Sequence, residues 1–289
     1  MPLTSPRLWI VATPLGNPGD LSPRAREILE NADLILAEDT RRAAQLCRLC
    51  GIQGRRFLSF YDHNEAERQE EVLRLLREGR DLALISDAGT PLLADPGYRL
   101  VRACRKEGLP VSPVPGPSAP AAALSAAGIA PLPHTFLGFL PRDTAGREAL
   151  LTAYAQVPGS LIFFERKDRL KESLATAARI LGPRDLAVCR ELTKTHEEFI
   201  LNRLEKSMDL PDELLGEITV IIGPPEVTER TPREEVESLL RVELARGGKP
   251  RDVARRVQSV VRGWNGKELY ALIPSAKDGM AKGPEADQH

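Results

Sequence analysis

The sequence is poor in cysteine, and the few it has are scattered. Its 289 residues include four cysteines, Cys47, Cys50, Cys104 and Cys189. Cys47 and Cys50 form a single C-x-x-C pair with neither a second such pair nor a His-x-x-x-His beside it, so the spacing does not support a zinc site. We expect the four thiols to be small buried groups in helices and a strand, and we expect no metal.

Long hydrophobic runs are also missing, as is an excess of one charge. No apolar run approaches the ~20 residues that cross a bilayer. The N-terminus lacks the charged and apolar regions of a signal peptide. The formal net charge is −1 at pH 7, so the charge of the whole chain indicates neither a polyanion binder nor an acidic tail. We expect a cytoplasmic protein without a membrane partner.

The common catalytic and phosphate-binding motifs are absent as well. The sequence has no G-x-x-x-x-G-K-[ST] phosphate cradle and no G-x-G-x-x-G dinucleotide fingerprint, which disfavours the use of a nucleoside triphosphate or NAD. It has no G-x-S-x-G nucleophile elbow and no cluster of metal-ligating residues. The remaining candidates for a site are loops rich in glycine, proline and carboxylates.

The most informative of these loops is Ser86–Pro91, with Asp95–Gly97 close behind it. The apolar run Leu82–Ile85 before it predicts a short buried strand. The pattern that follows predicts a helix from Tyr98, with Gly108 as its C-cap. The glycines of the loop let backbone approach a ligand, and its prolines hold it in one shape. Alone, the pattern fits a plain strand-to-helix turn equally well.

Three other predicted strands end in the same kind of turn. These strands cover residues 8–12, 33–37 and 111–114, and the turns that follow them are, in order, Thr13–Asp20, Glu38–Arg41 and Pro115–Ser118. If the strands are parallel, all four turns lie at one edge of the sheet, where α/β proteins bind their ligands. This convergence indicates a site more strongly than any single loop does.

Through residue 128 the predicted strands and helices alternate, which favours an N-terminal α/β domain, 1–128, with a mostly parallel sheet covered on both faces. Among its helices, one is predicted to begin with Ser22 as N-cap and Pro23 at the first position. Asn64 followed by Glu67 predicts a capping box for another. The proline-rich residues 129–134 lack periodicity and are interpreted as a linker.

Residues 135–225 predict a second, smaller α/β domain with strands of mixed direction. The expected strands cover residues 135–140, 160–165, 185–190 and 217–222, with a further extended segment near 198–201 and helices at 147–155 and 169–181. The third strand ends in the dense polar run Arg190–Glu197. Such a run is usually a solvated loop, but it can also face the loops of the first domain across a cleft.

Residues 226–275 predict a basic helical C-terminal region with two helices and a short end. Between Arg246 and Lys267 there are seven basic residues and one acidic residue, Asp252, with a tryptophan among them. Clustered positive charge with an aromatic side chain is typical of phosphate-backbone contact, although a solvated helix face explains it as well. We expect residues 276–289 to form a disordered tail.

A crevice lined by glycine and proline and edged by acids suits a ligand without phosphates that carries cationic centres and hydroxyls. S-adenosyl-L-methionine has these features. Carboxylates and backbone carbonyls can take its ammonium and ribose groups, and apolar loops can hold its adenine. The residue types therefore favour this cofactor over phosphorylated ones.

Nine short motifs, taken in order, are recognisable. They are Thr13–Asn17, Ala37–Arg41, Asp62–Glu65, Ser86–Pro91, Asp95–Tyr98, Pro115–Pro117, Leu124–Gly128, Gly138–Pro141 and Arg190–Thr195. Together they closely resemble the family of small-subunit ribosomal RNA cytidine-2′-O-methyltransferases in the tetrapyrrole methylase superfamily. The resemblance covers about residues 8–225, and more loosely the basic C-terminal region.

The resemblance implies two α/β domains with S-adenosyl-L-methionine in the cleft between them, usually in a homodimer. It also implies methylation of the ribose 2′-hydroxyl of a cytidine in 16S ribosomal RNA of the small subunit. The residues that it places at the cofactor are Pro14, Leu15, Gly16, Asp87, Ala88, Gly89, Ser118, Leu192 and Thr193. Two positions depart from the family pattern, Ala12 and Pro18. We expect Pro18 only to stiffen its turn.

Methyl transfer to a ribose hydroxyl requires an in-line approach and help in removing the hydroxyl proton, from a base or a nearby cation. The candidates for this catalytic role are Glu38, Asp39 and Lys194, with Asp87 and His63 as further possibilities. Each also has a structural explanation. The two acids after the second strand can pair with Arg41 or Arg42, Asp87 can hold the loop or the cofactor, and His63 can cap a helix.

Two other functions stay open on the sequence. One is a methyltransferase acting on a corrinoid or porphyrinogen, because the superfamily shares its core. The other is a non-catalytic RNA-binding assembly protein. The basic C-terminal region favours RNA over a tetrapyrrole, and failure to bind S-adenosylhomocysteine would favour the assembly protein.

Overall fold

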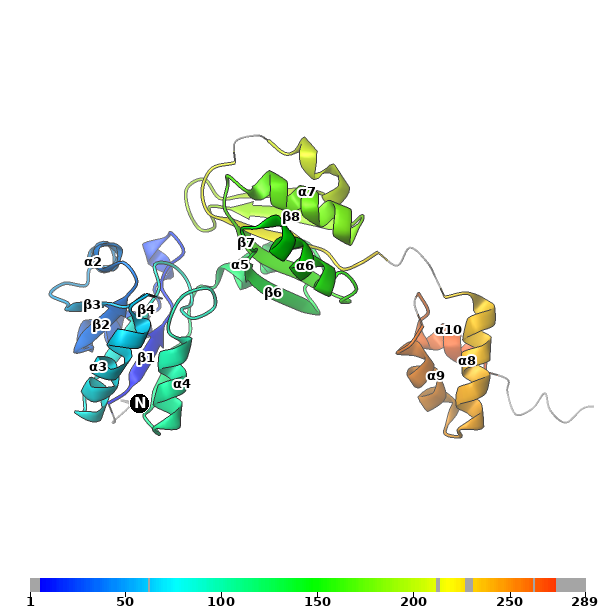
Figure 1. Ribbon diagram of the computed structural model, residues 1–289, viewed down its shortest axis with the longest axis horizontal. Coiled ribbons are helices and arrows are strands. Elements are labelled where there is room, and N and C mark those ends of the chain that lie inside the picture. The colour runs from blue at the N-terminus through cyan, green and yellow to red at the C-terminus, as the bar shows by residue number, and fades with distance from the viewer. Residues whose placement is uncertain (1–5, 62, 212–213, 227–230, 262, 274–289) are drawn as a thin grey trace, which may run out of the picture. The chain divides into compact units, whose positions relative to one another are not determined.

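The computed structural model describes residues 6–61, 63–211, 214–226, 231–261 and 263–273 (Figure 1). The chain divides into two compact units, residues 1–225 and residues 226–289. The first unit contains two five-stranded sheets, and the second contains helices. The tail predicted at 276–289 lies outside the described residues.

The first sheet is parallel throughout, with strand order β3-β2-β4-β1-β5. Its strands are β1 (Leu8–Val11), β2 (Leu34–Ala37), β3 (Phe57–Ser59), β4 (Leu82–Ile85) and β5 (Val111–Val114). The order makes β1 the neighbour of both β4 and β5. The loops that follow these three strands therefore emerge side by side at one edge.

Both faces of the first sheet are covered, because successive side chains of each strand point to opposite faces. Trp9 and Val11 belong to a core with α1 (Pro23–Asn31) and α2 (Thr40–Leu49). Leu8 belongs to the core on the other face, with α3 (Glu65–Arg77) and α4 (Tyr98–Lys106). Figure 1 shows α3 and α4 next to each other on this face. The predicted parallel sheet with two covered faces is confirmed.

The helix starts illustrate one correct and one wrong local prediction. The Ser22 hydroxyl accepts a hydrogen bond from the Ala25 N–H at 3.1 Å, as predicted for the N-cap of α1. Asn64 precedes α3, but its side chain makes no cap. Instead the Asn64 amide accepts from the Tyr61 N–H and donates to the Ser59 carbonyl. Bonds to the preceding turn therefore replace the predicted capping box.

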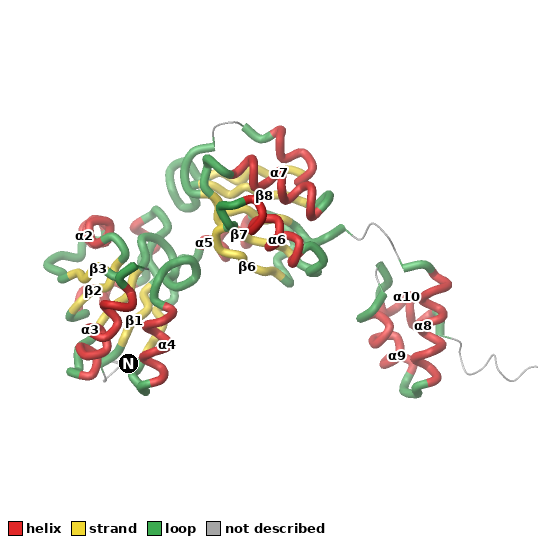
Figure 2. The backbone as a smooth tube through the Cα atoms, in the orientation of Figure 1, coloured by secondary structure: helices red, strands yellow, loops and turns green. Residues whose placement is uncertain are grey.

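The second sheet has the order β6-β7-β10-β8-β9 and mixed direction, as predicted. Its strands are β6 (His134–Phe139), β7 (Ser160–Glu165), β8 (Asp185–Arg190), β9 (Glu198–Arg203) and β10 (Ile218–Ile222). β6 and β7 are parallel and the other pairs are antiparallel. One face packs against α6 (Thr144–Tyr154), α7 (Leu170–Leu181) and the 3-10 segment η2 (Leu204–Asp209). Figure 2 shows α6 and α7 as neighbouring red helices beside this sheet.

The other face of the second sheet is covered by a helix that follows the first sheet in sequence. Helix α5 (Ala119–Ala126) comes directly after β5 and its loop. Ala123 and Leu124 of α5 share a core with Ile162 and Ile221 of the second sheet. The chain thus leaves the first sheet at β5 and reaches the second within a few residues.

The C-terminal unit has a small core of its own. It consists of α8 (Arg233–Ala245), α9 (Pro250–Gln258) and α10 (Gly266–Ala271). Their buried contacts are made by Val236, Leu240, Val253, Val257 and Leu269. Two helices were predicted here. The third, α10, begins with a capping box in which Asn265 and Glu268 bond to each other's backbone.

All four cysteines are free and buried, as the sequence predicts. Burial raises the pKa of the Cys47 thiol to about 11 and that of Cys189 to about 12, so both are protonated at neutral pH. In the described part of the chain, no helix combines the length and the apolar character needed to cross a membrane.

Candidate active site

The loops that follow β1, β4 and β5 are bonded into one assembly. Thr13 and Gly89 form an antiparallel bridge, with the Thr13 N–H donating to the Gly89 carbonyl at 2.8 Å and the Gly89 N–H donating back at 3.0 Å. The Thr90 hydroxyl donates to the Pro117 carbonyl at 2.9 Å. Two main-chain hydrogen bonds and one from a hydroxyl thus join the three loops at the carboxyl edge of the first sheet.

Two glycines allow this close assembly. Gly89 has φ +77°, and a Cβ placed there would lie 3.0 Å from Leu15 Cδ2. A Cβ at Gly116 would lie 2.9 Å from the Ala12 Cβ. The contact at Gly116 leaves no room for a side chain, and the positive φ of Gly89 would strain any other residue, so both positions favour glycine.

A cavity of about 570 Å³ opens beside the three loops. Its acidic residues are Asp87, Asp95, Glu165, Asp168 and Glu217, and its apolar ones include Leu15, Leu93, Phe139, Phe164 and Ile218. Arg166 and Lys167 are the basic residues of its lining. The cavity therefore combines carboxylates with an apolar wall, and both sheets of the first unit contribute to it.

Five of the nine predicted cofactor residues line this cavity: Leu15, Asp87, Ala88, Gly89 and Ser118. The other four, Pro14, Gly16, Leu192 and Thr193, do not belong to its lining in the described part of the chain. They lie next to it. Leu192 is buried in the same core as Leu15, and the Thr193 hydroxyl accepts from the Asn17 N–H at 3.3 Å.

Lys194 is held between two carboxylates. Its Nζ lies 3.0 Å from Glu191 Oε1 and 3.0 Å from Glu217 Oε2, and Glu217 lines the cavity. Burial lowers the pKa of Lys194, but the hydrogen bonds from its ammonium to Glu191 and Glu217 outweigh burial and raise the pKa above its ordinary value. Lys194 is therefore a cation at neutral pH and does not accept a proton.

Gly16 provides the space in which the Lys194 side chain lies. A Cβ at Gly16 would be 2.2 Å from Lys194 Cγ, which is far inside van der Waals contact. We expect Gly16→Ala to push Lys194 away from Glu217, because overpacking costs about 1–3 kcal/mol at such sites. Thermal unfolding and S-adenosylhomocysteine titration should show lower stability and weaker binding.

Gly19→Ala is the matched control for this substitution. A Cβ at Gly19 would meet only the Asn17 side chain, at 3.1 Å, in the same loop. Equal effects of the two alanines on binding would contradict the role assigned to Gly16.

Among the described residues, three other catalytic candidates lie outside the cavity lining: Glu38, Asp39 and His63. Asp39 is the N-cap of α2, and its carboxylate accepts from the Arg41 side chain at 3.0 Å and from two backbone N–H groups. These hydrogen bonds lower the pKa of Asp39 to about 2, and the bond from the Arg41 side chain has the largest effect. Asp39 is therefore a weak proton acceptor. Glu38 and His63 are exposed.

Of the residues predicted to take part in catalysis, Asp87 has the most suitable position. Its side chain lines the cavity, is 28% exposed, and accepts a hydrogen bond from Arg42 Nη1 at 2.8 Å. The Arg42 side chain therefore forms an ion pair with Asp87, while its backbone N–H bonds Asp39. The pair ties the first turn of α2 to the loop after β4.

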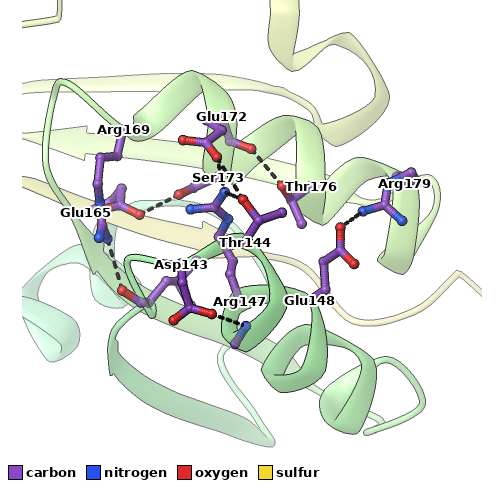
Figure 3. Close-up of polar contacts among 12 residues, drawn as sticks. Asp143, Thr144, Arg147, Glu148, Glu165, Arg169, Glu172, Ser173, Thr176 and Arg179 are labelled. Atoms are coloured by element: carbon purple, nitrogen blue, oxygen red, sulfur yellow. Dashed lines mark hydrogen bonds and ion pairs between the residues drawn. The ribbon is translucent and has the colours of Figure 1, made fainter.

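One residue of the cavity lining, Glu165, was not predicted from the sequence. Glu165 ends β7, its side chain is fully buried, and it accepts hydrogen bonds from Arg169 at 2.5 Å and from the Ser173 hydroxyl at 2.5 Å. Figure 3 shows Glu165 between these two residues. Arg169 also donates to the Leu140 carbonyl. A glutamate as the last residue of an otherwise apolar strand was the available signal.

Backbone strain concentrates near the same cavity. Leu92, Glu191 and Thr193 have φ values of +72°, +50° and +66°, in the left-handed region that non-glycine residues rarely adopt. Two of them belong to the polar run after β8, and the third lies in the loop after β4. Such strain is typical of functional loops that surrounding contacts hold in place. In the same described ranges, no group of three or more metal-ligating side chains is placed to hold an ion.

The sequence matches the family of Tetrapyrrole (Corrin/Porphyrin) Methylases over residues 7–207. It is 41% identical over 264 residues to a "Ribosomal RNA small subunit methyltransferase I" from Micromonospora olivasterospora, covering 89% of this chain and 84% of the relative. A protein of the same name from Escherichia coli O157:H7 is 48% identical over 192 residues, covering 66% and 67%. The chain belongs to the ribosomal RNA small subunit methyltransferase I family of tetrapyrrole methylases.

Solved structures show the same tetrapyrrole methylase fold. The uroporphyrin-III C-methyltransferase from Thermus thermophilus, crystallised with S-adenosylhomocysteine, aligns with a TM-score of 0.55 at 20% identity, covering 75% of this chain and 97% of that one. The methyltransferase CobJ aligns with a TM-score of 0.59 at 21% identity, covering 79% and 97%. The expected fold class is confirmed.

The cavity of this methylase fits S-adenosyl-L-methionine by the chemistry of its lining. Asp87, Asp95 and Asp168 supply carboxylates for a cationic ligand, and Leu15 and Phe164 supply apolar surface for a flat ring. The loops Thr13–Asn17 and Ser86–Pro91 present main-chain groups at their junction. A phosphate-bearing cofactor would instead face this row of carboxylates.

Proposed function

We propose that this protein transfers a methyl group from S-adenosyl-L-methionine to the ribose 2′-hydroxyl of a cytidine in 16S ribosomal RNA of the small subunit. The observation that carries the proposal is the acid-edged, half-apolar cavity at the joined loops after β1, β4 and β5, in a chain of this family. The name of its relatives supports small-subunit ribosomal RNA as the substrate.

The cofactor, when bound, supplies a methyl group made electrophilic by a sulfonium. We propose that Leu15, Asp87, Ala88, Gly89 and Ser118 hold it directly. Four further residues act indirectly, because they fix the two loops that flank the cavity: Pro14, Gly16, Leu192 and Thr193. The residues of the chain thus chiefly position the two reactants, which is the main requirement of an in-line displacement.

In the reaction the 2′-oxygen forms a bond to the methyl carbon, the carbon–sulfur bond breaks, S-adenosylhomocysteine leaves, and the hydroxyl proton passes to a base or to water. Of the candidates, Asp39 is engaged as a cap and Lys194 is already protonated. We propose that Asp39 fixes α2 and that Lys194 acts as a cation through Glu217. Glu38, Asp87 and His63 remain as candidates for the proton acceptor.

Lys194→Arg is expected to retain methyl transfer within about 5-fold, whereas Lys194→Met should lose about 10- to 100-fold, because only the charge is required. The raised pKa means that the charged form contributes to stability at any pH below its ordinary value of 10.5, and that this contribution is lost only as the pH rises through the folded-state pKa. A rate profile between pH 6 and 9 should show no inflection from Lys194. An inactive Lys194→Arg would instead indicate a base.

Incubation of the protein with labelled S-adenosyl-L-methionine and small ribosomal subunits that lack the modification tests the proposal. Mapping should place the label on a ribose 2′-oxygen of a cytidine. Cofactor binding without incorporation would point to a corrinoid or porphyrinogen acceptor. Absence of cofactor binding would point to a non-catalytic RNA-binding assembly protein.

We further propose that the protein works in the cytoplasm as a homodimer and that its C-terminal unit contacts RNA. Of the basic residues of α9 and its flanks, Arg246 and Arg256 share Glu243 as a partner. Lys249, Arg251 and Lys267 are exposed, and none of them has a carboxylate partner among the described residues. These three charges are available to phosphates.

A further inference from the structure

A second basic surface lies on the first unit. Residues 40–61 contain five arginines, Arg41, Arg42, Arg48, Arg55 and Arg56, and no aspartate or glutamate. A longer stretch without acids, 108–142, contains a single arginine. In a chain whose charges balance at −1, this is a strong local excess of one sign.

The fold gathers several of these arginines around an open groove of about 750 Å³. Arg41 and Arg48 stand seven residues apart on one face of α2, and both line the groove with Ala44 between them. Arg55 and Phe57 line its other side, where the chain enters β3. Among the described residues, no carboxylate belongs to the lining.

Most of this charge is not neutralised within the protein. Arg41 pairs with Asp39, and Arg42 pairs with Asp87. The side chains of Arg48 and Arg56 are exposed and make no hydrogen bond or ion pair with another described residue. Arg55 donates to the backbone carbonyls of Gln53 and Glu30, so its charge also stays without a carboxylate.

The groove begins at the edge of the candidate active site. α2 starts at the carboxyl end of β2, and Arg42 in its first turn bonds Asp87 on the cavity wall. The helix has ten residues, so it carries the arginine surface about 15 Å outward from that wall. If one unit of a polyanion enters the cavity, the phosphates of the neighbouring units therefore lie within reach of this surface.

We infer that the groove between α2 and β3 binds the phosphodiester backbone of the substrate RNA next to the methylated nucleotide. This inference rests on the proposed function and adds a docking surface to the one on the C-terminal unit. Arginine suits the task because its planar guanidinium makes paired hydrogen bonds to phosphate oxygens. Such contacts carry affinity and positioning rather than recognition of base sequence.

Arg48→Gln combined with Arg55→Gln tests the inference, because both side chains line the groove and neither has a carboxylate partner. We expect the KM for small subunits to rise about 5- to 10-fold with kcat little changed and unchanged affinity for S-adenosylhomocysteine. The slope of log KM against log salt concentration should become less steep by about 2, one for each lost phosphate contact. Arg48→Lys with Arg55→Lys should restore most of the affinity.

The matched control is Arg102→Gln with Lys106→Gln. Both residues are exposed on α4, which packs on the opposite face of the first sheet from α2, and the change in charge is the same. An equal rise in KM for the control, or an unchanged KM and salt slope for the groove variant, would overturn the inference.

Direct binding to 16S ribosomal RNA separates this inference from the proposed function. Filter binding should show the same 5- to 10-fold loss for the groove variant at fixed salt, whether or not methyl is transferred. If the wild type transfers no methyl but the groove variant binds RNA more weakly, the proposed function fails and the groove stands. If the wild type transfers methyl and RNA affinity is unchanged in the variant, only the groove assignment fails.

Discussion

Replacement of Asp87 with alanine is expected to reduce methyl transfer to small ribosomal subunits by about 100-fold or more. Asp87 is the carboxylate that joins the cavity to α2, through its 2.8 Å hydrogen bond with Arg42. Arg42 is 68% exposed and solvent screens the pair, so its loss accounts for at most about 1 kcal/mol, and the larger part of the effect comes from the cofactor site. The variant also loses negative charge beside a cationic cofactor.

Two companion variants separate the possible roles of Asp87. Asp87→Asn keeps the size and removes the charge, so weak S-adenosylhomocysteine binding in both variants would assign Asp87 to the cofactor. Normal binding with slow transfer, and a rate that no longer rises with pH, would assign it to the proton. Arg42→Gln removes the ion pair but keeps the Asp87 carboxylate, so it measures the contribution of the pair alone.

Asp185→Ala is the control for loss of an ion pair elsewhere. Its carboxylate lies 3.0 Å from Arg203 on the second sheet and is 65% exposed, so we expect wild-type activity. Full activity of Asp87→Ala, with binding and stability like those of Asp185→Ala, would remove the loop after β4 from the site.

Removal of the C-terminal unit after Pro225 should abolish methylation of small subunits while leaving cofactor affinity unchanged. The cut falls between two compact units, and α8, α9 and α10 share their own buried core. Linked binding surfaces gain about 10²- to 10⁴-fold in avidity over either one alone. Loss of one of two RNA-contacting surfaces is therefore expected to lower transfer at limiting subunit concentration by at least about 100-fold.

The measurement pairs S-adenosylhomocysteine titration with subunit methylation for residues 1–225 and for the whole chain. A full-length Lys249→Gln, Arg251→Gln, Lys267→Gln variant shows whether charge or the fold of the unit matters. Arg256→Gln is its counterpart, because it disrupts the internal pair with Glu243 and tests stability instead. Undiminished methylation by residues 1–225 would mean that the basic helices do not serve RNA binding.

The sequence predicts most strands and the edge at which the site lies, because these depend on local patterns. Apolar runs such as Leu82–Ile85 are buried on both faces, and the turns after parallel strands must meet at one edge. Ser22 could be predicted as a cap because its bond to Ala25 spans three residues. Asn64 could not, because its amide has equally near partners in the turn before it.

Contacts between distant segments could not be read from the sequence. Arg42 finds Asp87 across 45 residues, and neither position indicates the other. Small residues in α5 predict a buried helix, but not that it packs on the second sheet. The sequence also could not show that Lys194 is clamped by Glu217, because that pair depends on how β10 and the loop after β8 align.

The bridge between Thr13 and Gly89 has a thermodynamic consequence for binding. Main-chain pairing and the Thr90 bond to Pro117 fix the loops before any ligand arrives. A ligand that enters such a site does not have to order it, so little conformational entropy is lost on association. The heat capacity change of binding should then reflect the apolar surface that the cofactor covers, with no contribution from loop folding.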